Sequence, residues 1–242
     1  MDQRPAGEIG TAVSSLAELE LEGQTLDSLA EHVDRLGVQA LDGWDAAAMS
    51  LVTGREVATY GTTDERINPV DQAQYDLNKG PCVDAIGTGE IQYLDGTSVG
   101  PRWRQFAEIA ADHEVYSVLS FPMRLKGEVI GALNFYSRER DPIRPGHREE
   151  GSMLAAQAAV TVANARALMA RDKQTAQLEE GLKSRTMIGQ ATGLLMAQEG
   201  MSSDEAFQKL VHISQTSNIK LRDIAQRYVE AWEQRPVPKE LE

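Results

Sequence analysis

The feature that most constrains this chain is a long stretch without proline, from residue 152 to residue 235. Proline breaks helices because it lacks a backbone N–H and its ring clashes with the preceding turn, so this stretch is free to form long helices. A heptad-like series runs through its first part: Leu154, Thr161, Leu168, Thr175 and Leu182. Two interpretations stay open, a helix whose first half packs on its own sheet, or a coiled-coil-like parallel dimer helix that joins two domains. We expect the second, and hence a homodimer.

Two shorter helices are expected after Gly200. Ser202 and Glu205 have the spacing of a capping box, in which a hydroxyl and a carboxylate satisfy backbone N–H groups at a helix start. A further amphipathic pattern begins after Asn218, and Pro236 and Pro238 end it. The C-terminal part is therefore predicted to be a small three-helix unit.

The first 150 residues mix helix and strand patterns. Apolar residues at helical spacing occupy 26–36, and a second helical segment over 68–87 is interrupted at Gly80-Pro81. Residues 46–52 and 57–60 are predicted to form one β-hairpin, and 117–125 and 128–137 a second. Strands, a long connection and more strands indicate an α+β fold, an antiparallel sheet with flanking helices.

Charge and cysteine content exclude several classes of protein. The chain has 24 basic and 37 acidic residues, net −13, which predicts a soluble protein that avoids nonspecific nucleic-acid binding. Residues 183–229 differ, with six basic and four acidic side chains. Cys82 is the single cysteine, so a disulfide framework and a cysteine-rich zinc site are excluded. We expect no metal site, no membrane span, no signal peptide and a cytoplasmic location.

Gly189 and Gly193 lie four residues apart in the helical segment SRTMIGQATGLLM, residues 184–196. Each glycine costs a helix about 1 kcal/mol relative to alanine. On the residues alone, the simpler interpretation is that both glycines let this helix pack tightly on its two neighbours. The other interpretation is that they keep the helix surface bare for a ligand.

Residues 184–229 resemble the ANTAR domain, an RNA-binding module of transcription antitermination regulators. The resemblance covers SRTMIGQATGLLMAQEGMSSDEAFQKLVHISQTSNIKLRDIAQRYV, nearly the whole module. Residues from about 20 to 165 resemble a GAF domain, a sensory α+β fold, at KGPCVDA (79–85), RW (102–103), SVLSFP (117–122) and GALNFYS (131–137). We therefore expect a GAF domain over 11–165, a connecting helix over 166–182 and an ANTAR domain over 183–235.

The resemblance also implies site residues for RNA. The matching positions are Arg185, Gln190, Ala191 and Gly193. Lys220 and Arg222, at the start of the third helix, are second-rank phosphate candidates; the alternative is a solvated helix face paired with Asp223 or Gln226. Many relatives have lysine where this chain has Thr192, so we expect one phosphate contact fewer. Ile188 and Leu195 are expected in the core. RNA loops are read through splayed bases and close backbone contacts, which a bare helix face permits.

The GAF resemblance implies a sensor, and the sequence names no ligand or cofactor. Candidate sensor residues are Cys82, Trp103, Phe121 and Phe135. Cys82 follows Gly80-Pro81, and we expect a small buried residue at a helix start. The alternative is redox sensing, since a helix N-terminus would lower the pKa of its thiol. The partner implied is RNA with paired hairpins in a nascent transcript, and the signal is a small molecule, a protein or a redox change.

The GAF domain could also bind no ligand and serve only as a dimerisation platform, in a purely structural dimer module. Two other functions stay open beside a non-enzymatic regulator. One is DNA binding, because residues 220–226 resemble the first helix of a helix-turn-helix motif; this motif requires a recognition helix directly afterwards. The other is a thiol-based redox sensor or reductase that uses Cys82, although such a cycle ordinarily needs a second, resolving thiol.

Overall fold

A computed structural model describes residues 7–234 of the chain, and these divide into two compact units on either side of the Met169–Ala170 bond. The helices of the N-terminal unit are α1 (Gly7–Ala17), α2 (Leu26–Ala40), α3 (Asn68–Leu77), α4 (Pro81–Thr88) and α5 (Arg104–Asp112), with a 3₁₀ turn at Glu65–Ile67. Its strands are β1 (Ala46–Thr53), β2 (Glu56–Thr62), β3 (Gln92–Leu94), β4 (Ser117–Leu125) and β5 (Glu128–Ser137). Helix α6 (His147–Glu199) crosses the boundary, and α7 (Ser203–Ser217) and α8 (Leu221–Glu233) complete the C-terminal unit.

The sheet of the N-terminal unit has five antiparallel strands in the order β2-β1-β5-β4-β3. Both predicted hairpins are confirmed as β1–β2 and β4–β5, and β1 joins them by pairing with β5. In this register Ala48 lies opposite Asn134, and Asn134 in turn lies opposite Ser120 on β4. The α+β fold with flanking helices is confirmed.

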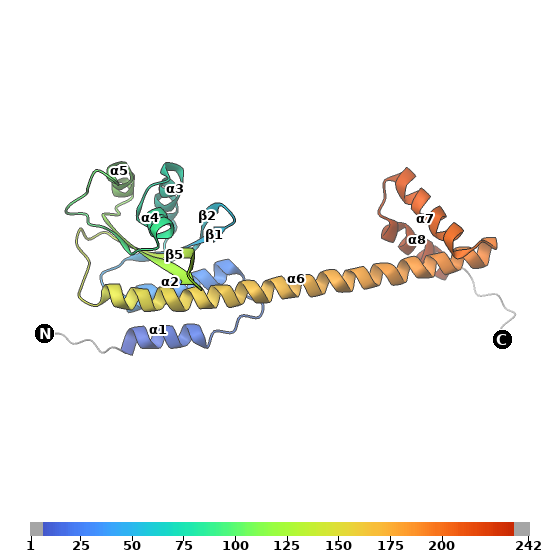
Figure 1. Ribbon diagram of the computed structural model, residues 1–242, viewed down its shortest axis with the longest axis horizontal. Coiled ribbons are helices and arrows are strands. Elements are labelled where there is room, and N and C mark those ends of the chain that lie inside the picture. The colour runs from blue at the N-terminus through green and yellow to red at the C-terminus, as the bar shows by residue number, and fades with distance from the viewer. Residues whose placement is uncertain (1–6, 235–242) are drawn as a thin grey trace. The chain divides into compact units, whose positions relative to one another are not determined.

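Each face of the sheet carries its own helices (Figure 1). On one face α1, α2 and the start of α6 cover strand residues such as Met49, Phe121 and Phe135. On the other face α3 and α5 cover Val118 and Tyr136. Sequence alternation produces this division, because successive residues of a strand point to opposite faces.

The first half of α6 belongs to the core of the N-terminal unit. Gly151 allows the close approach, because a Cβ there would overlap the ring of Phe121. By length and composition α6 could cross a membrane. Its apolar residues in this half pack on the sheet, however: Leu154, Ala155, Ala158, Ala159, Val162 and Ala165 are buried. Packing inside the unit therefore accounts for these six apolar residues.

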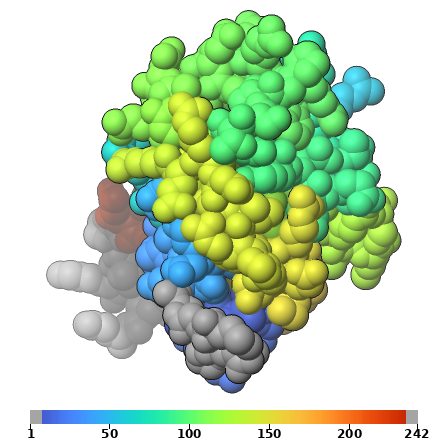
Figure 2. Space-filling view, turned by 90° about the vertical axis from the view of Figure 1, so that its left-hand side faces the viewer, coloured from blue at the N-terminus to red at the C-terminus, as the bar shows by residue number. Residues whose placement is uncertain are grey.

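The heptad-like series is split between two environments. Leu154 and Thr161 are buried in the core of the N-terminal unit, so these two positions cannot contact a second chain. The expectation that the whole heptad-like series forms a dimer interface is therefore corrected. Leu182, by contrast, is 64% exposed. The outward side of the first half carries Met153 and Val160, both exposed, and the start of α6 is visible in yellow at the surface in Figure 2. Dimerisation stays a prediction.

Helix α7 of the C-terminal unit begins and ends where the sequence indicated. The Ser202 hydroxyl accepts a hydrogen bond from the backbone N–H of Glu205, whose carboxylate accepts one from the Ser202 backbone N–H at 2.8 Å. Asn218, with φ of 53°, ends α7 in the left-handed conformation that asparagine tolerates. The three helices enclose a small core of buried residues: Ala191, Leu195, Ala206, Leu210, Ile224, Ala225 and Val229. Pro236 and Pro238, predicted to end the last helix, lie outside the described residues.

Candidate nucleic-acid interface and sensory domain

An exposed face runs along the part of α6 that lies in the C-terminal unit. Arg185, Gly189 and Gly193 follow one another at four-residue intervals, and all three are exposed, as is Gln190 beside them. Among the residues that the structure describes, nothing lies within 4 Å of a Cβ built at Gly189 or Gly193. The interpretation that these glycines allow tight helix packing is therefore wrong. They leave bare helix surface open to solvent.

Ala191 lies on the opposite side of α6 and has no exposed surface. It packs in the core with Leu195 and Ala206, so the expectation that Ala191 contacts RNA is corrected. The reason is helical geometry: residue 191 is turned by about 160° from residue 193, measured the short way round the helix. Thr192 is also largely buried, and its hydroxyl donates to the Ile188 carbonyl at 2.7 Å. That position does not belong to the exposed face either.

Lys220 and Arg222 stand at the start of α8 in different situations. Lys220 is the exposed residue that precedes the helix. Arg222 forms ion pairs with Glu180 of α6 and with Asp223, the latter at 3.4 Å between Nε and Oδ1. Arg222 lines an open groove of about 460 Å³ between α6 and α8. The other lining residues are Glu180, Lys183, Ser184, Met187, Asp223 and Gln226.

In the N-terminal unit, polar side chains form a buried hydrogen-bonded chain between the sheet and α3 and α4. The Ser50 hydroxyl is its centre: it accepts from the Asn134 amide at 2.9 Å and from the Cys82 thiol at 3.1 Å, and it bonds the Tyr75 hydroxyl at 2.8 Å. Tyr75 continues to the Thr59 hydroxyl at 2.8 Å. The chain thus reaches an open cavity of about 300 Å³ beside edge strand β2, which Thr59 and Tyr75 help to line.

Asp71 anchors the far end of this chain. It is buried, and its carboxylate accepts hydrogen bonds from Thr59 at 2.8 Å, from Gln74 at 3.2 Å and from the Tyr136 hydroxyl. Burial raises its pKa from 3.8 to about 6, because desolvation disfavours the charged form more than these bonds favour it. Sequence reasoning missed Asp71, Tyr75 and Ser50. A usable signal was the presence of serine and asparagine at inward positions of apolar strands.

Cys82 does not have the lowered pKa expected at a helix start. It is the second residue of α4, but it is wholly buried, and burial raises the pKa of its thiol to about 12. Desolvation outweighs the helix dipole, whose effect is small and falls off within a turn. A thiol in this state is a poor nucleophile at neutral pH.

The four candidate sensor residues do not share a pocket. Phe121 and Phe135 pack edge to face, with ring centroids 5.8 Å apart, in the core on the α2 and α6 side of the sheet. Cys82 lies on the other side, near Ser50 and Asn134. Trp103 packs near α5 and donates its indole N–H to Asp84 at 2.6 Å. Phe121 and Phe135 are therefore corrected from sensor candidates to core residues.

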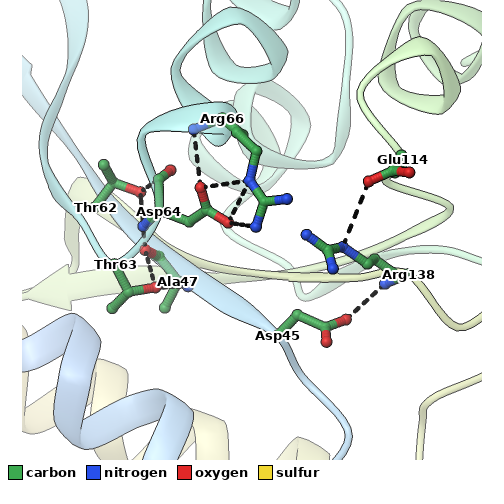
Figure 3. Close-up of polar contacts among 8 residues, drawn as sticks. All are labelled: Asp45, Ala47, Thr62, Thr63, Asp64, Arg66, Glu114 and Arg138. Atoms are coloured by element: carbon green, nitrogen blue, oxygen red, sulfur yellow. Dashed lines mark hydrogen bonds and ion pairs between the residues drawn. The ribbon is translucent and has the colours of Figure 1, made fainter.

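A charged cluster at the end of the sheet was also not predicted (Figure 3). Arg66 binds Asp64 through two guanidinium nitrogens, and Arg138 contacts Glu114 at 4.0 Å. The Arg138 backbone N–H donates to Asp45 at 2.7 Å. The ion pair with Arg66 lowers the pKa of Asp64. Each guanidinium group of the cluster thus faces a carboxylate, Arg66 that of Asp64 and Arg138 that of Glu114. Over residues 7–234 no group of three or more His, Cys, Asp or Glu side chains could hold a metal ion.

Comparison with known proteins agrees with this architecture. The profile of the GAF domain matches residues 23–163, and that of the ANTAR domain matches residues 176–229. No curated protein matches the sequence. Of the solved structures, the GAF domain of a phosphoenolpyruvate-protein phosphotransferase from Coxiella burnetii has a TM-score of 0.52 at 18% identity, over 67% of this chain and 97% of that chain.

A free methionine-R-sulfoxide reductase from Neisseria meningitidis, solved with its substrate, has a TM-score of 0.51 at 17% identity, over 66% of this chain and 89% of that one. Structural similarity at this low sequence identity shows only that the fold is shared. With more than half of its residues matched, the chain belongs to the GAF domain family, and it joins this sensory domain to an ANTAR domain, the RNA-binding module of transcription antitermination regulators.

Proposed function

We propose that this protein is a cytoplasmic regulator whose ANTAR domain binds paired hairpins in nascent RNA. The observation that carries the proposal is the exposed face of Arg185, Gly189, Gln190 and Gly193, whose two glycines have no packing role among the described residues. The arginine supplies charge for a phosphate, the glutamine hydrogen-bonds a base edge, and the bare backbone permits close approach to an unstacked loop.

The charge distribution supports the same site. Six basic side chains occur in residues 183–229, and within the described part of the chain only Lys209 and Arg222 among them form ion pairs. Lys183, Arg185, Lys220 and Arg227 are left for phosphates. The acidic remainder of the protein repels RNA, so binding concentrates on the ANTAR domain.

Antitermination then follows as a population shift. By binding the antiterminator fold more tightly than the competing terminator, the protein favours continued transcription. A homodimer brings two ANTAR domains to two hairpins, and the second contact gains from effective concentration. The GAF domain receives the signal that biases this binding. The buried chain around Ser50, together with the cavity at Thr59 and Tyr75, is the candidate receiving site.

Binding of a tandem two-hairpin RNA to the full-length protein tests the proposal. Arg185→Ala should weaken binding and reduce the slope of log K against log salt by about one unit, since one phosphate contact is lost. Arg171→Ala is the matched control, because Arg171 is an equally charged, exposed residue of α6 that precedes the ANTAR match. Equal effects of both changes would refute the site. Binding to duplex DNA without preference for hairpin RNA would instead favour the helix-turn-helix alternative. The second helix that this motif requires would lie beyond residue 234, outside the described residues.

A further inference from the structure

An open groove lies between α6 and α8 in the C-terminal unit, and none of Arg185, Gly189, Gln190 and Gly193 lines it. Its volume of about 460 Å³ lies within the range of small-molecule sites, large enough for a single nucleotide. Met187 offers an apolar surface for a base, while Ser184 and Gln226 offer hydrogen-bonding groups. Lys183 and Arg222 place two cations on its walls.

The groove is electrically neutral in the free protein, since Glu180 and Asp223 balance these two cations. Glu180 is the more important of the two carboxylates, because it reaches Arg222 from the other helix. A carboxylate and a phosphate bind arginine through the same planar arrangement of donors. Glu180 therefore occupies the position that an RNA phosphate would take at Arg222.

We propose that this groove takes one unstacked nucleotide of the hairpin loop, with Arg222 on its phosphate, and that Glu180 competes with that phosphate in the free protein. The inference rests on the proposed RNA-binding function and adds a second contact region to it. It also gives a direct role to Glu180, which lies near the start of the ANTAR match, four positions before Ser184. Glu180 controls whether the guanidinium group of Arg222 on α8 is free for RNA.

How strongly Glu180 competes with an RNA phosphate for Arg222 depends on the solvent exposure of the Glu180–Arg222 ion pair. The side chains of Arg222 and Glu180 are 39% and 60% exposed, so solvent screens their interaction. An exposed ion pair contributes about 0.2 to 1 kcal/mol, which corresponds to an affinity change of up to about fivefold. Glu180→Gln should therefore tighten RNA binding by up to about fivefold.

The test measures affinity of the full-length protein for a tandem two-hairpin RNA, with Glu180→Gln, Arg222→Gln and the double variant. Glu179→Gln is the matched control: it removes the same charge from the adjacent exposed position, where no ion pair forms within the described residues. Arg222→Gln should weaken binding and reduce the salt slope by about 0.7, the value for one contact to a single strand. In the Arg222→Gln background, Glu180→Gln should add nothing beyond the Glu179→Gln effect.

The outcomes separate the two proposals. If the wild-type protein does not bind hairpin RNA, the proposed function is refuted. If it binds, but Glu180→Gln equals Glu179→Gln or Arg222→Gln leaves affinity unchanged, the groove inference is overturned while the function stands. Urea unfolding of each variant shows whether the C-terminal unit keeps its stability, so that an affinity change can be assigned to the groove.

Discussion

Replacing Gly189 and Gly193 of α6 distinguishes the effect of these glycines on the stability of the helix from their effect on RNA binding. A Cβ at Gly189 or Gly193 meets nothing within 4 Å among the described residues, so alanine adds no clash. It restores the helix propensity that glycine lacks, about 1 kcal/mol at each position and about 2 kcal/mol for both. Gly189→Ala and Gly193→Ala should therefore each stabilise the C-terminal unit, although both positions lie in the proposed binding face.

Urea unfolding of the full-length chain, followed by circular dichroism, measures this gain. For a unit of this size the slope of free energy against urea is about 1 kcal/mol/M, so each alanine should raise the midpoint of its transition by about 1 M. Destabilisation by alanine would refute the reasoning, because it would mean that the face is covered or that the backbone departs from an α-helix there.

Gly193→Leu completes the experiment, because leucine is also a good helix former but projects a bulky side chain from the face. It should preserve stability and lower affinity for a two-hairpin RNA by at least about tenfold, or about 1.4 kcal/mol. Gly181→Leu is the matched control, since Gly181 is equally open on the same helix and lies before the exposed face of Arg185, Gly189, Gln190 and Gly193. Unchanged RNA affinity in Gly193→Leu, measured with a folded protein, would remove the glycine face from the site.

Three further predictions concern the two cores. Asp71 has its pKa raised to about 6, so the folded state holds the proton more tightly than the unfolded state, and stability is lost as pH rises through that value. Asp71→Asn removes this dependence. Between about pH 4 and about pH 7 the free energy of unfolding of the variant should therefore rise by about 2.4 kcal/mol relative to that of the wild type. A difference that does not change with pH would contradict the assignment. Cys82, with a pKa of about 12, should have a thiolate fraction of about 10⁻⁴ at about pH 8. We therefore expect it to react with a thiol reagent only when the protein unfolds locally. Rapid labelling of the native protein would contradict this expectation. Leu210→Ala should destabilise the C-terminal unit by about 2 to 5 kcal/mol and leave the transition of the N-terminal unit in place, which urea unfolding checks.

The local elements of this protein could be predicted from its sequence, because short-range rules produce them. A short apolar run followed by a Gly-Arg turn indicated the first hairpin, and alternation along residues 128–137 indicated the second. The Ser202–Glu205 pair indicated the start of α7. The absence of proline allowed one continuous helix from His147 to Glu199. The motifs around Lys79–Ala85 and Ser184–Arg185 identified two domain families whose profiles match the chain.

The environment of each candidate residue was decided only by the tertiary structure. Ala191 and Gly193 are two positions apart, yet one is buried and the other open, because the packing of α7 and α8 selects which side of α6 is covered. Cys82 stands at a helix start, but the surrounding core, not the helix end, sets its pKa. Sequence periodicity fixes the angle between neighbouring side chains. Periodicity does not determine which residues from distant segments of the chain pack against a given side chain. Those distant residues decide whether the side chain is buried and whether it forms an ion pair, as Glu180 does with Arg222.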